Sequence, residues 1–202
     1  AAHGPAYEPG SGYHYSDGHS AALGLILSNV SEMPAEQFIH ESIFIPLGMS
    51  DTYCLLGDKA PDRERVCNTY FWREGQYRKL WDNEAPPETP FFRASGGVYS
   101  TTTDYAKFLS LWMKRGRFSQ VQLLKESSVE KALTPGPNHQ SYGLHWQLHH
   151  AAVGDEVRPV FGHGGSSGTL ALALPEHDAM VFYFTQSRGT LTADFLTTLV
   201  LR

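Results

Sequence analysis

Two segments of the chain concentrate side chains that can do chemistry, and the first surrounds Tyr15. Tyr13-His14-Tyr15-Ser16-Asp17 places two phenols, an imidazole, a hydroxyl and a carboxylate within five residues. A tyrosine has an ordinary pKa of about 10, so it acts as a general base only beside a cation that stabilises the phenolate. The segment is compatible with proton transfer at Tyr15, and also with an aromatic-rich turn that precedes a helix.

The second segment is rich in glycine and lies near the other end of the chain, at Gly162-His163-Gly164-Gly165-Ser166-Ser167-Gly168. Four glycines in seven residues permit close backbone approach and unusual dihedral angles. The segment could be a plain turn between two strands. It could also be a strand edge whose backbone N–H groups face a substrate oxygen, with His163 at the mouth of the site.

The glycine-rich segment also matches the G-x-S-x-G nucleophile elbow, through Gly164-Gly165-Ser166-Ser167-Gly168. That elbow requires a strand before the serine and a helix after it. Residues 169–174 instead have the pattern of a strand, and no Asp followed by His comes later, because His177 precedes Asp178 and Asp194. We therefore do not expect an elbow here.

Ser128-Val129-Glu130-Lys131 matches the S-x-x-K pattern of penicillin-binding enzymes. The match lies on a short polar helix predicted over residues 127–133 and stopped by Pro135. A nucleophile should instead lie at the start of a buried helix beneath a sheet. We therefore expect the match to be fortuitous.

Three histidines, His145, His149 and His150, could suggest a metal site. If residues 142–148 form a strand that continues to His149, then His145 and His149 share one face about 13 Å apart. Two ligands at that distance cannot bind one ion. We expect solvated histidines here, and neither a metal nor a cofactor.

The composition is that of a globular protein, with 202 residues of which 41% are hydrophobic and 18% charged. The net charge of -5 and the lack of basic clusters argue against nucleic-acid binding. No apolar run could span a bilayer, and the first residues do not form a signal peptide. The chain does not begin with Met, so we expect its natural N-terminus upstream. Cys54 and Cys67 could pair or remain thiols, and they leave the compartment open.

Helical patterns come first along the chain and strand patterns last. We expect a buried helix over 20–27, a helix from about 34 to 46–48, a helix capped by Thr102-Thr103-Asp104 and closed by Gly116, and a short helix over 127–133. A hairpin turning at Glu74-Gly75 interrupts the loop-rich residues 51–90. Strands are predicted over 142–148, 158–161, 169–174 and 180–185, and a last helix over 192–201. This order predicts one α+β domain, with a helical and loop-rich part (1–135) and a part with the C-terminal strands and terminal helix (136–202).

Five segments carry a family resemblance when they are taken in order. They are Pro9-Gly10 with Tyr13-His14-Tyr15-Ser16-Asp17-Gly18, Pro46-Leu47-Gly48-Met49 with Asp51-Thr52, Ser95-Gly96-Gly97-Val98-Tyr99-Ser100-Thr101 through Asp104, Tyr142-Gly143-Leu144 with Trp146, and Phe161-Gly162-His163-Gly164-Gly165. The series resembles the serine β-lactamase and penicillin-binding protein superfamily, of the class C β-lactamase, DD-peptidase and related esterase type, and covers nearly the whole chain. The resemblance implies a β-lactamase/transpeptidase-like fold, in which helices flank an antiparallel sheet beside a helical region.

In this family the first strands and the S-x-x-K helix precede the tyrosine segment, whereas this chain begins just before it. The resemblance therefore implies that the N-terminal strands and the helix with the nucleophilic Ser and its Lys are missing here. The chain would be a fragment, a chain completed by a partner, or a non-catalytic remnant. The resemblance implies a periplasmic or extracellular location, but no residue of this chain specifies its compartment.

The resemblance also implies roles for individual residues. Tyr15 matches the tyrosine that shuttles protons to and from the nucleophile, and Asp17 matches an Asn of the family. His163 matches the Lys or His of the third motif, followed by Gly164 and Gly165 on the substrate-binding strand. The N–H of Ser166 matches the second oxyanion donor, and the first donor would be the N–H of the missing nucleophile.

Two departures from the family pattern limit the substrate. His163 and Gly164 stand where a Lys and a Thr bind the carboxylate of a β-lactam, and Asp17 adds a negative charge that repels such an anion. We therefore expect acyl-enzyme chemistry on a small ester, amide or peptide rather than efficient β-lactam hydrolysis. The alternative is a non-catalytic protein that binds a peptide, glycan or protein in the same cleft. We expect the chain alone to be inactive, and to expose a sheet edge that pairs with the missing segment or with another chain.

Overall fold

The computed structural model describes residues 4, 7–54, 63–81, 92–153, 156–189 and 198 of the chain. The helical elements are α1 (Asp17–Ser31), α2 (Ala35–Ile39), a π-helical turn (His40–Phe44), α3 (Ile45–Leu47), α4 (Thr102–Met113) and α5 (Glu126–Ala132), with 3₁₀ turns at Arg63–Arg65 and Pro175–His177. The strands are β1 (Thr69–Arg73), β2 (Gln76–Trp81), β3 (Arg117–Phe118), β4 (Val121–Gln122), β5 (Gln147–Val153), β6 (Glu156–Gly165), β7 (Thr169–Leu174), β8 (Ala179–Phe184) and β9 (Ser187–Arg188). The predicted α+β class is confirmed.

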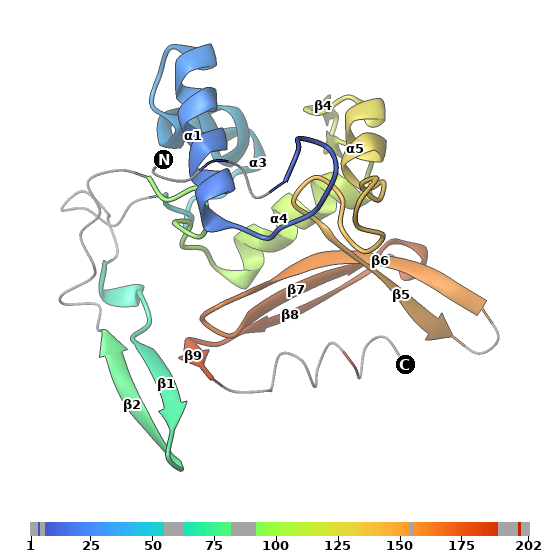
Figure 1. Cartoon of the computed structure of the whole chain (residues 1–202). Helices are drawn as coiled ribbons and strands as arrows, with labels where there is room; N and C mark the ends of the chain where they lie inside the picture. The colour runs from blue at the N-terminus through green and yellow to red at the C-terminus, as the bar shows by residue number, and fades with distance from the viewer. Residues whose placement is uncertain are drawn as a thin grey trace.

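Four antiparallel strands form the main sheet, in the order β5-β6-β7-β8 (Figure 1). The first residue of β5, Gln147, pairs with Gly162. The last residues of β6 therefore extend past the first residue of β5. On its other side β6 remains paired with β7 as far as Gly165 and Thr169. The last three residues of β6 therefore have one β-strand neighbour and one open side. This open side lies below the start of α1 in Figure 1.

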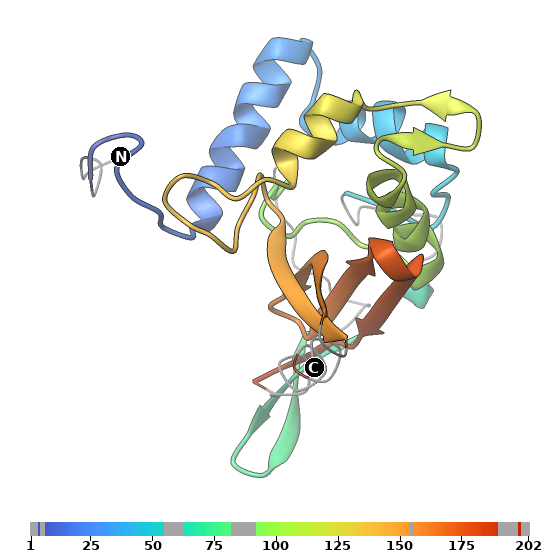
Figure 2. The ribbon, with the colours of Figure 1, turned by 90° about the vertical axis from the view of Figure 1, so that its right-hand side faces the viewer.

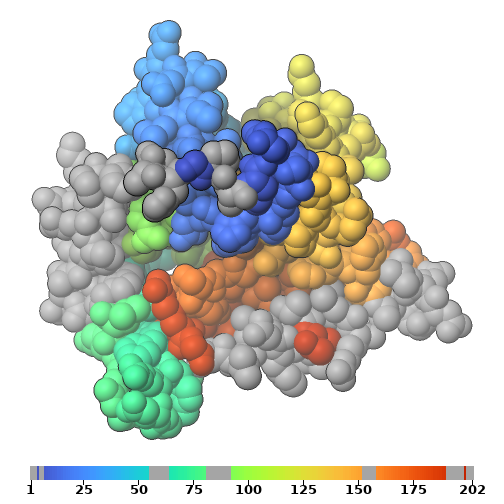
Figure 3. All heavy atoms as spheres, in the orientation of Figure 1, coloured from blue at the N-terminus to red at the C-terminus, as the bar shows by residue number. Residues whose placement is uncertain are grey.

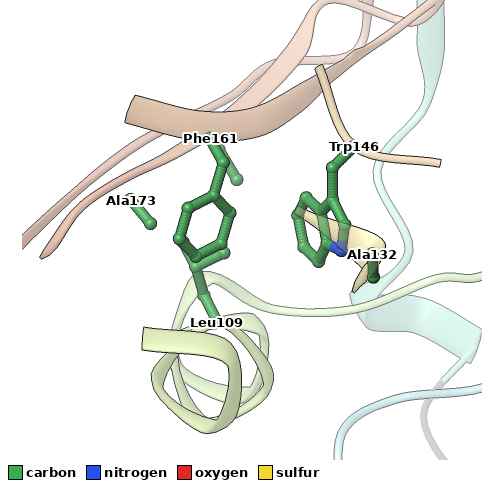
Figure 4. Close-up of a cluster of buried hydrophobic side chains, with 6 residues drawn as sticks. Leu109, Ala132, Trp146, Phe161 and Ala173 are labelled. Atoms are coloured by element: carbon green, nitrogen blue, oxygen red, sulfur yellow. The ribbon is translucent and has the colours of Figure 1, made fainter. Parts of the chain in front are cut away.

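The main core lies between one face of this sheet and α4 (Figure 4). Leu109 of α4 is fully buried against Phe161 of β6 and Ala173 of β7. The indole of Trp146 meets the ring of Phe161 edge-on, with centroids 5.2 Å apart. The apolar face of α4 packs on the same cluster through Tyr105, Phe108, Trp112 and Met113.

The N-terminus of α4 is fastened by a buried carboxylate. The residue that caps the helix is Thr101, whose hydroxyl accepts the N–H of Asp104. The cap therefore lies one residue before the predicted segment 102–104. The side chain of Asp104 instead accepts the N–H of Asp51 at 2.7 Å and the hydroxyl of Thr52 at 3.0 Å. Lys107 forms an ion pair with the same carboxylate at 2.8 Å. The Asp51-Thr52 segment is thereby held against α4.

Helix α1 forms where it was predicted, but the prediction that it is buried was wrong. None of its residues is buried, and Leu25, Ile26 and Val30 are 68%, 56% and 79% exposed. The apolar sequence indicates a helix covered on most sides. Within the described part of the chain, α2 and the segment around Ala94 cover only one side of α1.

Two further predictions needed correction. Pro46 does not end the second helix, because it lies within α3, which follows the π-helical turn without a break. Gly48, with φ 63°, ends it. Residues 142–146 are not a strand: His145 has φ 61°, which interrupts extended structure, and β5 begins only at Gln147.

The remaining predicted elements agree with the structure within a few residues. The hairpin turns at Glu74 and Gly75, whose φ angles of 53° and 79° are those of a type I′ turn. The short helix became α5, and the other three predicted strands became β6, β7 and β8. The helix predicted over 192–201 lies outside the described residues except for Thr198, which is helical. Cys54 is buried, Cys67 is exposed, and both are free thiols. None of the described helices is long and apolar enough to cross a bilayer.

Candidate active site

Three segments that are distant in sequence meet at the open end of β6. They contribute Tyr15 from the segment before α1, Tyr142 from the loop before β5, and His163 from β6. The ring centroids of Tyr15 and His163 are 6.2 Å apart, and those of Tyr15 and Tyr142 are 6.3 Å apart. The rings of Tyr142 and His163 stand edge to face at 5.8 Å. The structure thus brings together two of the residues predicted for the site, Tyr15 and His163.

The segment that carries Tyr15 is held against the loop before β5, as Figures 2 and 3 show. The amide of Asn138 donates to the carbonyl of Gly10 at 2.6 Å. The ring of Tyr13 packs on His139, with centroids 4.2 Å apart. Ser16 then caps α1 by accepting the N–H of Gly18 at 3.2 Å. Tyr15 is therefore fixed immediately before the helix, with 57% of the residue exposed to solvent.

Sequence reasoning missed Tyr142 as a member of the site. Its hydroxyl lies 2.6 Å from Nε2 of His163, and Nδ1 of the same ring lies 2.5 Å from the carbonyl oxygen of Gly164. Burial raises the pKa of Tyr142 to about 12, with further contributions from Tyr15 and Tyr13. The Tyr-Gly-Leu-x-Trp pattern at residues 142–146 was the available signal, but it was interpreted as part of a strand.

Beyond His163 the chain forms a tight turn between β6 and β7. The N–H of Gly164 donates to the side chain of Gln147 at 3.2 Å. Gly168 has φ 86°, and its N–H donates to the carbonyl of Gly165 at 3.0 Å. In the described chain the N–H of Ser166 has no hydrogen-bond partner, and the residue is exposed. A strand follows this turn, which agrees with the expectation that no nucleophile elbow is present.

Asp17 is the predicted site residue that the structure leaves outside this cluster. It is the first residue of α1, where a negative charge is favourable beside the helix N-terminus. It is exposed, and its carboxylate makes no hydrogen bond or ion pair with any residue that the structure describes.

The other sequence candidates lie apart from the site. Ser128 and Lys131 are both exposed on α5. The described residues contain no group of three His, Cys, Asp or Glu side chains that could hold a metal ion. His145 lies in a loop and His149 in β5, so the argument that they share a strand face does not apply. Burial lowers the pKa of His149, and the neighbouring His150 and His163 lower it further.

An apolar cavity of about 240 Å³ lies along α1. Leu23, Gly24 and Leu27 of α1 form one wall, and Ile39 of α2 and Phe92 form the other. Ser20, Ala35, Ala94 and His145 complete the lining. The cavity begins one helical turn after Asp17, close to where the Tyr15 segment enters α1.

Comparisons with known proteins identify the family and agree with the fold. The family profile described as Beta-lactamase matches residues 1–201, and the chain therefore belongs to the β-lactamase family. Among curated relatives, Protein Rv1367c of Mycobacterium tuberculosis is 30% identical over 93% of this chain and 52% of its own length. An Escherichia coli K12 protein named "Putative D-alanyl-D-alanine carboxypeptidase" is 27% identical over 93% of this chain and 48% of its own length. The chain thus spans about half the length of these relatives.

Solved structures show the same fold at lower identity. A simvastatin synthase mutant (LovD6) from Aspergillus terreus superposes with a TM-score of 0.78 at 19% identity, over 96% of this chain and 55% of the other. The octameric penicillin-binding protein homologue from Pyrococcus abyssi gives 0.74 at 22% identity, over 96% and 44%. A D-stereospecific amidohydrolase from a Streptomyces species gives 0.71 at 19% identity, over 96% and 56%. The fold is therefore β-lactamase/transpeptidase-like.

Proposed function

We propose that this chain is the C-terminal portion of a serine hydrolase that transfers acyl groups through an acyl-enzyme. The convergence of Tyr15, Tyr142 and His163 at the open side of β6 is the observation that carries the proposal. Membership of the β-lactamase family supports it, and the names of relatives and structural neighbours include a carboxypeptidase and an amidohydrolase. In this proposal the nucleophilic Ser and its Lys belong to a segment upstream of residue 1.

Each site residue has a role in the proposed reaction. The nucleophilic Ser attacks the substrate carbonyl while its proton passes to the Tyr15 phenolate, which the upstream Lys stabilises. The negative oxygen of the tetrahedral intermediate accepts hydrogen bonds from the N–H of Ser166 and from that of the nucleophile. The proton then passes to the leaving group, which departs as the acyl-enzyme forms. Water hydrolyses the acyl-enzyme by the same steps in reverse.

The open side of β6 supports a place for the substrate. An extended substrate can lie beside Gly164 and Gly165, because no strand of the described chain pairs with β6 there and the N–H of Gly164 is bonded only to the side chain of Gln147. The exposed N–H of Ser166 lies at the end of this edge, where an oxyanion donor is needed. We propose an ester, a neutral amide or a peptide as the substrate, since His163 and Gly164 stand where a Lys and a Thr would bind a carboxylate.

The exposed surface of α1 supports a place for the upstream segment. Leu25, Ile26 and Val30 leave an apolar surface in water, and the cavity beside Leu23 and Leu27 is apolar as well. Among the described strands, β8 pairs only with β7 and so leaves one sheet edge open. We propose that the upstream segment covers α1 with its helical part and β8 with its strands.

Replacing the base tests the proposed reaction directly. In the protein extended to include the upstream segment, Tyr15→Phe is expected to lower kcat/KM for phenyl acetate by about 10²–10⁴-fold, because the proton acceptor is lost. Tyr13→Phe is the matched control, and should remain close to the unchanged protein. If Tyr15→Phe retained full activity, or if the unchanged extended protein showed none, the proposal would fail in favour of a binding role.

A further inference from the structure

The contacts of His163 define which ring nitrogen carries the proton. Nδ1 lies 2.5 Å from the carbonyl oxygen of Gly164. A carbonyl oxygen can only accept a hydrogen bond, so Nδ1 must be the protonated nitrogen. In a neutral imidazole Nε2 then carries a lone pair, and the hydroxyl of Tyr142, 2.6 Å away, must be the donor to it.

The surroundings agree with this assignment. Burial, followed by the neighbouring Tyr15 and Tyr13, raises the pKa of Tyr142 to about 12, so the phenol keeps its proton around neutral pH. In the described chain no carboxylate, lysine or arginine contacts the His163 ring. The titratable groups near the ring are His145, His149, the Tyr15 phenol and Tyr142 itself. Burial lowers the pKa of both His145 and His149, which favours their neutral forms.

We propose that Tyr142 is a positioning residue that locks His163 in the neutral Nδ1–H tautomer, so that this corner of the site presents an uncharged phenol–imidazole pair. Both ring nitrogens are then occupied by protein partners. His163 cannot exchange a proton directly with a substrate. The Tyr142 hydroxyl donates a hydrogen bond to Nε2, and its oxygen keeps lone pairs that can accept from a substrate O–H or N–H.

The substrate class follows from the uncharged pair, and this part of the inference rests on the proposed function. A carboxylate placed against His163 would meet no cation and would accept no proton from either ring nitrogen. An uncharged substrate with a hydroxyl or an amide N–H can instead donate to the Tyr142 oxygen. We therefore infer that the part of the substrate beside His163 is neutral, as in an ester of a neutral alcohol or an amide.

The tautomer can be measured on the 202-residue chain itself. In the ¹⁵N-labelled chain, imidazole ¹⁵N chemical shifts from multiple-bond correlation spectra report which nitrogen is protonated. We expect His163 as the Nδ1–H tautomer in the unchanged chain, and a substantial gain of the Nε2–H form in Tyr142→Phe. Tyr13→Phe, which removes a neighbouring phenol that packs on Tyr142, should leave the tautomer unchanged.

Two results would overturn the inference. One is a predominant Nε2–H tautomer or an imidazolium at pH 7 in the unchanged chain, a result that does not require the variant to fold. The other is a folded Tyr142→Phe chain, judged by its amide spectrum, in which the tautomer of His163 stays the same. If Tyr142 had only a structural role, its replacement would not change the tautomer of His163 reported by the ¹⁵N chemical shifts.

A pair of esters tests the substrate class in the extended protein. Phenyl acetate should be preferred over 3-carboxyphenyl acetate by about tenfold in kcat/KM, each normalised to its uncatalysed hydrolysis, because the added carboxylate would meet no cation and no free donor beside His163. A preference for the carboxylated ester would overturn the neutral substrate class. If neither ester were hydrolysed, the proposed function would fail, while the tautomer of His163 would still be decided by the spectra.

Discussion

Asp104 is a single residue on which the junction between α4 and the preceding chain depends. Its burial alone would raise the pKa of the carboxyl group, but the hydrogen bonds from Lys107, the N–H of Asp51 and the hydroxyl of Thr52 outweigh this effect and hold the pKa below its ordinary value. A carboxyl pKa that is lower in the folded chain than in the unfolded chain stabilises the fold above the unfolded value. This stabilisation is lost as the pH falls through the lowered pKa of the folded chain.

The Asp104→Asn variant should therefore show a pH-dependent loss of stability. At pH 7 we expect the free energy of unfolding to fall by about 1–3 kcal/mol, because the ion pair with Lys107 and a charged acceptor are lost. At about pH 2 the difference should be smaller, since a falling pH protonates the carboxyl group first in the unfolded chain and then, at the lowered pKa, in the folded chain. Urea unfolding at the two pH values measures both quantities. Asp178→Asn, at an exposed left-handed position that Asn tolerates, should change little at either pH. An equal loss at both pH values would contradict the electrostatic account.

At the same scale, the sequence allowed part of the site to be predicted. Tyr15 and His163 were recognised because each lies in a short pattern of characteristic residues. Tyr142 was not, because its role depends on a hydrogen bond to a residue 21 positions away, and that contact exists only once the loop before β5 turns back over β6. Local spacing carries no information about such a turn.

At the scale of elements, the sequence predicted those whose partners lie within the chain. Helix α4 was predicted correctly and packs on the sheet, and the hairpin was predicted correctly because Glu74-Gly75 specifies its turn. In the strand predicted over 142–148, residues 142–146 were wrong because the left-handed backbone of His145 breaks an otherwise alternating pattern. The burial of α1 was wrong for a different reason: apolar periodicity indicates that a helix is covered, but does not say by what.

Two leucines distinguish these helices experimentally. Leu109→Ala in α4 should lower the free energy of unfolding of the chain by about 2–5 kcal/mol, because it leaves a cavity in the core. Leu25→Ala in α1 should change it by less than about 0.5 kcal/mol, since the side chain is already in water. In the extended protein the cost of Leu25→Ala should rise to at least about 2 kcal/mol if the upstream segment buries this residue. An unchanged small effect would mean that the segment does not cover α1.

At the scale of the whole molecule, the described chain combines a candidate site with two surfaces that no described residue covers. Tyr15, Tyr142 and His163 of the candidate site are held together by contacts within the described chain. The two surfaces are the apolar side of α1 and the edge of β8 that no described strand pairs. The chain also spans only about half the length of its relatives, at 52% and 48% of two of them. We infer that the upstream segment completes both the core and the catalytic machinery.

Reaction with a fluorophosphonate probe, followed by intact-mass spectrometry, tests the central claim most directly. The 202-residue chain and the extended protein are treated alike, and any adduct is located by peptide mapping. The proposal predicts no adduct on the chain, and a single adduct on the extended protein at a serine upstream of residue 1 that requires Tyr15 for rapid reaction. An adduct at Ser128 or Ser166, or no adduct on either protein, would contradict it.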